Sequence, residues 1–446
     1  MTSPSLPRER PALLGPIRAR GERPALTLRR GSGMHVELED GRTVLDVGSL
    51  SSCILGHCHP EVVAAVREAA GQVYVTESTG YAPRERAAED LLRIAFAGEP
   101  WAESVVFFVS SSEAADLGLL LAQTLTGREP LVSRELAYHG ATGLGRDVST
   151  HPLFGAALAS PTGGSTPRHA CTPTRRLPLP DCGRRRLGPE HVCAESCLRS
   201  AAELLDGAAA VITDYSQGGL IPSPQYQDTL ASAARAAGAL SIADETVTAF
   251  GRLGHGFAFQ RGASRPDMVT LGKGITAGAV AGGALVLSRE VVERIDGRRW
   301  MTSSTYRGNP LTVAAISAVM RVLERERLAD RAATLGAKLG ADLERVVERH
   351  PSAKRVIGEG MLWLIELASA PEHAEGAWCG DGTQAPLTDV VQRAALERGV
   401  LIGAYSGQTI WLVPPLIAEA EQLEQAVEAL DEALDEADRE LERRQP

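Results

Sequence analysis

Short apolar runs alternate with longer amphipathic segments from about residue 100 onward, and this alternation limits the fold more than any other feature of the chain. The apolar runs are SVVFFV, PLVS, AAVIT, ALSIA, DMVTLG and GALVLS. The amphipathic segments include AADLGLLLAQTL, CAESCLRSAAELLD and YQDTLASAARAAG, which are typical of helices. Near-continuous apolar strands between helices indicate a largely parallel sheet that is covered on both faces. The pattern therefore predicts a doubly wound α/β fold.

The two ends of the chain predict a second, smaller α+β domain. Residues 33–48 indicate two strands around an Asp-Gly turn. A long, broken helical pattern covers 309–350, and strand-like segments at 355–367, 399–405 and 409–413 precede an acidic closing helix. We expect an N-terminal arm and part of the small domain in residues 1–80, the large domain in 81–310, and the rest of the small domain in 311–446. The Pro-, Thr- and Arg-rich segment 150–195 is expected to be irregular.

The composition argues against several classes of protein. A net charge of −10 disfavours a nucleic-acid binder, which usually presents a basic face. No apolar run reaches the ~20 residues that span a bilayer, and the Arg- and Pro-rich start lacks the apolar centre of a secretory signal. We therefore expect a cytoplasmic protein without a membrane segment.

Seven cysteines are an odd number for a disulfide framework, and a chain of this length does not need one. Four of them, Cys171, Cys182, Cys193 and Cys197, fall in one polar region. Their spacing is irregular and lacks the paired C-x-x-C pattern of zinc sites. We therefore expect free thiols and no metal.

Chemically useful groups follow four of the expected strands. Three serines, 110–112, follow the first strand, and Asp214 and Asp244 end two others. Lys273 lies between glycines after the fourth. Because ligands bind beyond the carboxyl ends of the strands in an open α/β sheet, we expect these groups to share one site.

Each group has a chemical reason to be there. Only three of the 46 basic residues are lysines, and Lys273 alone follows an apolar strand, where partial burial favours a nucleophilic amine that forms a Schiff base. The serines fit a phosphate, although a simple helix cap is the alternative. Asp244 either caps a helix or keeps a pyridine nitrogen protonated. Phosphate, lysine and carboxylate are together what pyridoxal 5′-phosphate requires.

Six segments, in order along the chain, resemble motifs of the class III (ω-type) pyridoxal-phosphate aminotransferases of fold type I. They are LGHCHPEVVAAV, SSSEAAD, AYHG, SIADETVTAFGRLGHGFAF, PDMVTLGKGITAG and STYRGNPL. The resemblance implies that Lys273 binds the cofactor covalently and moves the proton, and that Asp244 holds the pyridine N–H. It also implies a homodimer with shared active sites.

The resemblance assigns further cofactor contacts. Ser111 and Ser112 would bind the phosphate, together with Thr305 of the partner subunit. Tyr138 would stack on the ring, with His139 beside it. Val247 would line the ring where the family often has Gln.

Two departures from the family concern the substrate. Many members carry, at the position of Trp411, an Arg that clamps a substrate carboxylate. The loop DYSQGG is two residues shorter than the family's E-P-x-x-G-x-G-G and lacks the second Glu, which pairs with that Arg in a subset of members. Since either partner alone would be an unpaired buried charge, their joint loss is self-consistent.

We therefore expect an amino-acid donor and a ketone or aldehyde acceptor without an adjacent free carboxylate. The expected pocket is lined by Ser51, Cys53, Tyr81, Tyr215 and Trp411. The pattern is similar to daptide-type aminotransferases of ribosomal-peptide biosynthesis, which aminate a ketone at a modified peptide's C-terminus.

Three alternatives stay open. An ordinary class III ω-amino acid or diamine:keto acid aminotransferase would use another Arg, with Arg307 and Arg252 as candidates. A pyridoxal-phosphate isomerase or decarboxylase could use the same scaffold. A catalytically silent cofactor-binding protein would not need the Lys273–Asp244 pair.

Overall fold

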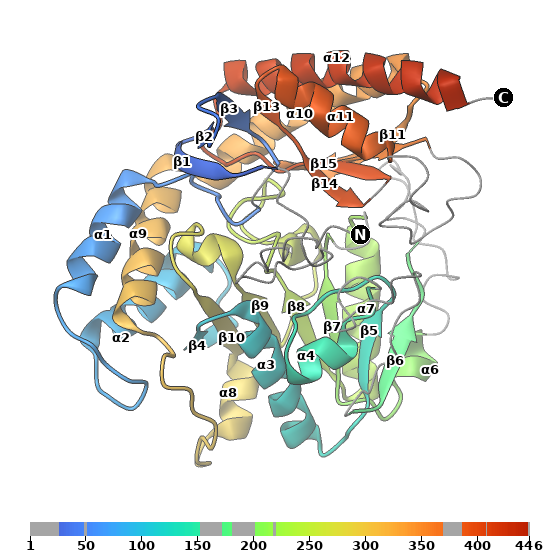
Figure 1. Ribbon diagram of the computed structural model, residues 1–446. Helices are drawn as coiled ribbons and strands as arrows, with labels where there is room; N and C mark the ends of the chain where they lie inside the picture. Colours follow the sequence, from blue (N-terminus) through green and yellow to red (C-terminus); the bar gives the residue numbers. More distant parts are fainter. Residues whose placement is uncertain are drawn as a thin grey trace, which may run out of the picture.

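The computed structural model describes residues 26–48, 51–151, 172–180, 201–216, 220–368, 386–406 and 408–444. The larger part of the molecule is built around a seven-stranded sheet (Figure 1), whose strands have the order β4-β10-β9-β8-β7-β5-β6. Only β10 runs against the others, because it pairs antiparallel with both β4 and β9. The expected largely parallel sheet is thus confirmed. Its strands are β4 (Ala102–Phe108), β5 (Leu131–Arg134), β6 (Thr174–Leu177), β7 (Ala210–Asp214), β8 (Leu240–Asp244), β9 (Met268–Leu271) and β10 (Gly283–Ser288).

Helices cover both faces of this sheet. Neighbouring residues of β7 show the two faces, since Ile212 is buried in a cluster with α3 and Val211 in a cluster with α7. Ser110 caps the start of helix α3, because its hydroxyl accepts the Glu113 backbone N–H at 3.3 Å. The helices are α3 (Ser111–Thr126), α4 (Gly143–Val148), α6 (Ala201–Leu205), α7 (Pro224–Ala237) and α8 (Arg289–Ile295).

The smaller α+β part draws on both ends of the chain, as expected. One sheet has the order β1-β2-β3-β13 and joins the ends directly, because Val400 of β13 pairs in parallel with Leu45 of β3. The other has the order β11-β12-β15-β14. The domain limits at residues 80 and 310 stay predictions. The strands are β1 (Leu28–Ser32), β2 (His35–Leu38), β3 (Thr43–Asp46), β11 (Ala353–Glu359), β12 (Leu362–Leu367), β13 (Val400–Leu401), β14 (Gly403–Ser406) and β15 (Thr409–Leu412).

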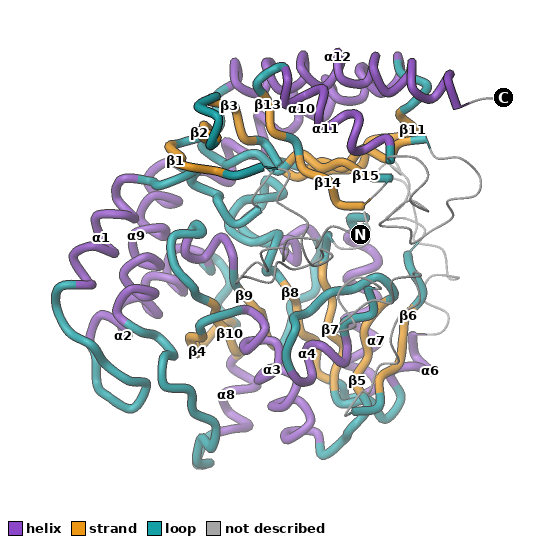
Figure 2. The backbone as a smooth tube through the Cα atoms, viewed as in Figure 1, coloured by secondary structure: helices purple, strands orange, loops and turns teal. Residues whose placement is uncertain are grey.

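Three C-terminal helices lie over one side of the sheet formed by β11, β12, β15 and β14 (Figure 2). The expected long, broken helical stretch is confirmed as α9 and α10, which meet at Arg327 in the left-handed conformation (φ 49°). Against α9 pack two N-terminal helices. The helices are α1 (Pro60–Ala70), α2 (Ala82–Asp90), α9 (Pro310–Glu326), α10 (Leu328–Arg349), α11 (Leu387–Glu397) and α12 (Ala420–Arg444).

Two expectations about strands are wrong. Residues 399–405 do not form one strand, because β13 and β14 belong to different sheets. Gly403 permits this split: a Cβ there would lie 2.3 Å from the Gly48 carbonyl oxygen. The segment expected to be irregular also contains β6, an edge strand of sequence TRRL whose polar side chains hid it.

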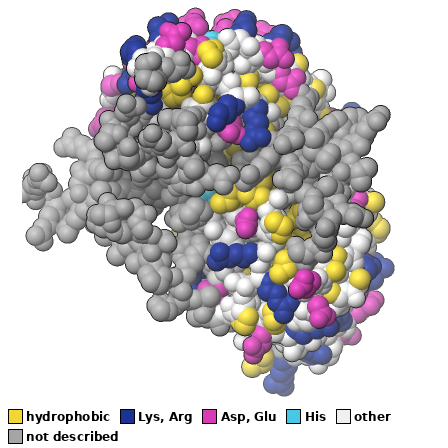
Figure 3. Space-filling model, turned by 90° about the vertical axis from the view of Figure 1, so that its right-hand side faces the viewer, with side chains coloured by type: hydrophobic (Ala, Val, Ile, Leu, Met, Phe, Trp, Pro, Cys, Tyr) yellow, Lys and Arg dark blue, Asp and Glu magenta, His cyan; other side chains and the backbone are white. Residues whose placement is uncertain are grey.

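Charged side chains of both signs are interspersed over the described part of one face (Figure 3). Within the described ranges, the structure contains no helix with the length and apolarity needed to cross a bilayer.

Candidate active site

The carboxyl ends of three neighbouring strands bring the expected catalytic groups together. Asp244 is the last residue of β8 and lies in register between Asp214 of β7 and Thr270 of β9. Lys273 follows β9 by two residues, and both carboxylates act on its charge. The structure thus brings Asp214, Asp244 and Lys273 to one edge of the sheet, as expected.

Lys273 is held in an unusual backbone conformation beside the carboxylates. Its φ is +43°, in the left-handed region that few non-glycine residues adopt. Burial lowers the pKa of its amine, although Asp244 and Asp214 partly counteract this effect. Among the described residues, the half-buried amine makes no hydrogen bond or ion pair. An amine with a lowered pKa and no hydrogen-bond partner among the described residues is suited to forming a Schiff base.

Asp244 is buried and surrounded by hydrogen-bond donors. It accepts from the Thr246 hydroxyl (2.5 Å) and backbone N–H (3.1 Å), from the Thr270 hydroxyl (3.1 Å), and from Nδ1 of His139 (2.8 Å). Burial alone would raise the pKa of this carboxyl, but the His139 and Thr246 contacts outweigh it and lower the pKa. Asp244 is therefore a stable carboxylate, as the partner of a protonated pyridine nitrogen must be.

The serine turn begins α3 at the same edge. The Ser110 hydroxyl is used as the helix cap, and that of Ser112 accepts the Ala141 N–H at 3.3 Å. The Ser111 hydroxyl makes no hydrogen bond within the described ranges. It lies close to Gly272, where a Cβ would come within 2.9 Å of Ser111 Oγ. A helix start beside the reactive lysine, with an unused hydroxyl and free backbone N–H groups, is suited to a phosphate.

The other expected cofactor contacts are placed less uniformly. Tyr138 is half-buried, and its pKa is raised by burial and then by Asp244. Val247 is buried three residues after Asp244. His139 contacts Asp244 directly. Thr305 is exposed and its carbonyl accepts the Glu77 N–H at 3.3 Å, and no contact among the described residues joins it to Lys273.

Trp411 is fixed on β15 by two glycines. Its Nε1 donates to the Gly48 carbonyl at 2.9 Å. Gly403 pairs with it in register, and a Cβ at 403 would lie 1.9 Å from Nε1. The half-buried ring thus occupies space that any side chain at 403 would need.

Of the expected pocket residues, Cys53 lies near the segment after Lys273 and Tyr215 lines a cavity under α7. Cys53 and Ser51 are buried, and Cys53 Sγ would be 3.2 Å from a Cβ on Gly278. Tyr81 is half-buried at the start of α2. Tyr215 lines a cavity of about 40 Å³ with Thr213, Gln227 and Phe259, among other residues of the β7–β8 face under α7. Residues 217–219 of the shortened loop and the four cysteines at 171–197 lie outside the described residues.

The two arginines considered as alternative carboxylate clamps are both engaged by the protein. Arg252 is fully buried and donates to the carbonyls of Met361 (2.9 Å), Pro414 (2.5 Å) and Ser51 (3.4 Å). Burial lowers its pKa to about 10. Arg307 pairs with Glu77 at 3.2 Å and lies over the ring of Phe108.

Sequence reasoning did not identify the surroundings of Asp244 and Lys273. Arg134, at the end of β5, forms a buried ion pair with Asp214 at 2.5 Å. Glu245 is fully buried, and burial raises the pKa of its carboxyl to about 7. A charged residue at the end of an apolar run was the available signal for Arg134. For Glu245 the signal was its place directly after Asp244.

Comparison with known proteins agrees with this geometry. A family model described as aminotransferase class III matches residues 17–434. Diaminobutyrate–2-oxoglutarate aminotransferase of Rhizobium meliloti is 30% identical over 91% of this chain and 87% of its own. Acetylornithine aminotransferase of Mycobacterium tuberculosis is 31% identical over 91% of each chain. The crystal structure of an S-selective transaminase from Arthrobacter is 27% identical, with a TM-score of 0.86 over 95% of each chain.

The residues present fit the family's cofactor, pyridoxal 5′-phosphate. In the part of the chain that the structure describes, the Lys273 amine and the Ser111 hydroxyl make no hydrogen bond, and both lie with the Asp244 carboxylate at one sheet edge. When bound there, the cofactor supplies an electron sink for moving amino groups. With the fold, the site and the family model in agreement, the chain belongs to the class III aminotransferases, which depend on pyridoxal phosphate.

Proposed function

We propose that this aminotransferase transfers an amino group from an amino acid to a ketone or aldehyde that has no carboxylate next to its carbonyl. The observation that carries the proposal is the fixed indole of Trp411, bound to Gly48 and accommodated by Gly403. An indole offers an apolar wall and one N–H donor, which is already used. It cannot form the bidentate pair with which an Arg binds a carboxylate.

Arg252 and Arg307 support the proposal because both are engaged by other groups of the protein and neither is available to bind a substrate carboxylate. A substrate carboxylate that recruited Arg252 would leave buried backbone carbonyls without donors. Recruiting Arg307 would separate it from Glu77. An acceptor on a peptide C-terminus, as in daptide biosynthesis, has no counterpart among the relatives reported above. The proposal is therefore the broader class of neutral carbonyl compounds.

Replacing Trp411 tests the substrate class. We expect Trp411→Arg to raise kcat/KM for 2-oxopentanoate relative to pentan-2-one by roughly 10–100-fold, because a charge-assisted hydrogen bond contributes about 1.5–3 kcal/mol. Trp411→Phe is the matched control, since it removes the N–H but keeps an apolar ring. If Trp411→Arg and Trp411→Phe have the same preference, the carboxylate argument is wrong.

The second candidate is an ordinary ω-amino acid or diamine:keto acid aminotransferase. The names of the two relatives, a diaminobutyrate–2-oxoglutarate aminotransferase and an acetylornithine aminotransferase, favour it. This candidate predicts that 2-oxoglutarate is the best acceptor of the wild-type enzyme. A panel of acceptors separates the two candidates.

We also propose the roles of the cofactor contacts. Lys273 binds the cofactor covalently and moves the proton, Asp244 holds the pyridine N–H, and the start of α3 with Ser111 and Ser112 binds the phosphate. Tyr138 and Val247 flank the ring. Lys273→Ala should abolish the visible absorption band of the lysine-bound cofactor, whereas a band that persists would refute the lysine assignment.

Two linked segments next to Thr305 support a homodimer. Glu77 accepts from the Ser304 N–H at 2.9 Å and from Arg307 at 3.2 Å, which joins residues 73–77 to residues 302–307. Nearby apolar side chains are exposed, with Tyr74 at 88% and Met301 at 85%. Exposed apolar surface of this kind is typical of an interface. The exposed set is Val73, Tyr74, Trp300, Met301 and Tyr306.

In such a dimer Thr305 would reach the phosphate of the partner subunit. Tyr306→Asp should convert dimer to monomer in sedimentation velocity and weaken cofactor binding. Leu28→Asp, at an exposed apolar residue of β1, is the control. Wild-type protein that sediments as a monomer at micromolar concentration would refute the homodimer.

A further inference from the structure

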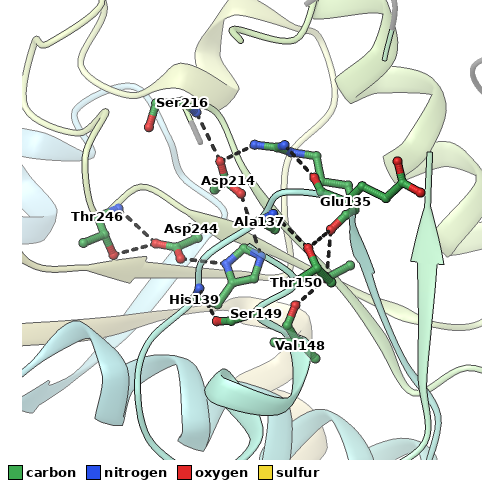
Figure 4. A network of polar contacts seen from close by, with 12 residues as sticks. Glu135, Ala137, His139, Val148, Ser149, Thr150, Asp214, Ser216, Asp244 and Thr246 are labelled. Atoms are coloured by element: carbon green, nitrogen blue, oxygen red, sulfur yellow. Dashed lines mark hydrogen bonds and ion pairs between the residues drawn. The ribbon is translucent and has the colours of Figure 1, made fainter. Parts of the chain in front are cut away.

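Four buried charged or titratable side chains lie in a row across the ends of β5, β7 and β8 (Figure 4). Arg134 Nη2 is 2.5 Å from Asp214 Oδ1, and Asp214 Oδ2 is 3.9 Å from His139 Nε2. His139 Nδ1 is 2.8 Å from Asp244 Oδ2. No side chain in the row is more than 6% exposed. The row therefore connects Asp244 to a second, deeper ion pair.

The two ring nitrogens of His139 are in different situations. Nδ1 is at hydrogen-bond distance from a carboxylate, which can only accept, so Nδ1 carries a proton. Nε2 is 3.9 Å from Asp214, which is beyond hydrogen-bond range. At that distance Asp214 can attract a proton to Nε2 through its charge but cannot bond it directly. A neutral imidazole with its proton on Nδ1 would satisfy these contacts.

Arg134 determines how strongly Asp214 acts on the imidazole. Its guanidinium lies against Asp214 Oδ1 and balances that charge. Without the guanidinium, the unbalanced carboxylate would favour a second proton on His139. An imidazolium beside Asp244 would then neutralise the carboxylate that the pyridine nitrogen needs.

Two further titratable side chains, Lys273 and Tyr138, lie near this row. Lys273 follows β9 by two residues, and Asp244 and Asp214 both stabilise its charged form. Tyr138, next to His139, is kept neutral by burial and by Asp244. The balance at His139 therefore depends on the charges of Asp214 and Asp244, with Arg134 as the compensating cation.

We propose that Arg134 and Asp214 are positioning residues that keep His139 neutral, so that Asp244 retains its full charge toward the cofactor's ring nitrogen. The proposal rests on the assignment of Asp244 in the proposed function. It extends that assignment to two residues that touch neither cofactor nor substrate.

The test is a double-mutant cycle in the full-length holoenzyme, in which each charged side chain is replaced by a neutral one. The variants are Arg134→Met, Asp214→Asn and the double variant. The readouts are the side-chain ¹⁵N shifts of His139, assigned with His139→Gln, and the affinity for pyridoxal phosphate. Arg134→Met should give a doubly protonated His139 and weaken cofactor binding at least ~10-fold, the lower end of typical outer-shell effects. The double variant should restore both.

Controls separate this result from general damage and from failure of the proposed function. Asp267→Asn removes a partly buried carboxylate that accepts from Ser241 at the opposite edge of the sheet. It should leave the His139 shifts and cofactor affinity unchanged. If Asp244→Asn leaves the affinity unchanged, the cofactor assignment is wrong, while the ¹⁵N shifts still test the row.

Two results would overturn the proposal. One is a wild-type His139 already protonated on both nitrogens. The other is a cycle in which the shifts do not respond to Arg134→Met, or in which the double variant is no better than the worse single variant. Should Arg134→Met fail to fold, the double variant and Asp214→Asn decide: His139 must stay neutral in both.

Discussion

Replacing Arg252 distinguishes a structural role from substrate binding. Its side chain ties together three segments, since it donates to the carbonyls of Ser51, Met361 and Pro414. Arg252→Met leaves the two closest acceptors, at 2.9 and 2.5 Å, buried without donors. Each unsatisfied buried acceptor costs about 1–3 kcal/mol, so the free energy of unfolding should fall by about 2–6 kcal/mol.

The assay is urea denaturation followed by circular dichroism, at fixed protein and cofactor concentrations because both affect apparent stability. The matched control is Arg128→Met, since Arg128 also donates to two carbonyls, those of Ala208 and Ala237, but is only partly buried. Water can replace its hydrogen bonds, so the control should lose much less stability. In Arg252→Met, kcat/KM should fall by similar factors for carboxylated and neutral acceptors.

One result would refute this reasoning. If Arg252→Met matches the control in stability but loses activity only with substrates that carry a carboxylate, Arg252 is a carboxylate clamp. The argument from Trp411 would then fail as well, since a second Arg would serve the pocket.

Three further predictions concern stability and packing. Burial would lower the pKa of His350, but two carboxylates of α12 raise it overall. The stabilisation that protonated His350 gives the folded protein is present below pH ~6.5 and should disappear as the pH rises through the raised pKa. The urea midpoints of wild type and His350→Gln should therefore converge above that pH. Gly403→Ala should displace the Trp411 indole and destabilise the protein by about 1–3 kcal/mol, whereas an unchanged thermal midpoint would contradict the packing described. The pKa of Glu245 is raised to about 7, so between pH ~4.5 and 7 its carboxyl stays protonated in the folded state while it ionises in the unfolded state. Wild type should therefore lose stability relative to Glu245→Gln over this pH range. Denaturation midpoints that do not change with pH would contradict this.

The sequence predicted the parts of the fold and site that depend on local pattern. Strands buried on both faces are near-continuous apolar runs, so β7–β10 could be found directly, and the apolar run of β4 could be found in the same way. Lys273 and Asp244 could be found because they follow such runs. The edge strand β6 could not, since its polar side chains make TRRL look like a loop.

Contacts between distant segments could not be predicted. Asp214 and Arg134 are 80 residues apart, and only the order of strands in the folded sheet places them together. The Trp411 ring depends on Gly48, 363 residues away. The hydrogen bonds of Arg252 could not be predicted for the same reason, because its carbonyl partners come from three separate segments.

We propose that Trp411 takes the place of a carboxylate-binding Arg in this aminotransferase. The most direct test is kcat/KM of the wild-type enzyme for pentan-2-one and 2-oxopentanoate, which differ only by a methyl group in place of a carboxylate, with the amino donor it uses fastest. We expect a higher value for pentan-2-one. A higher value for 2-oxopentanoate would contradict the proposal.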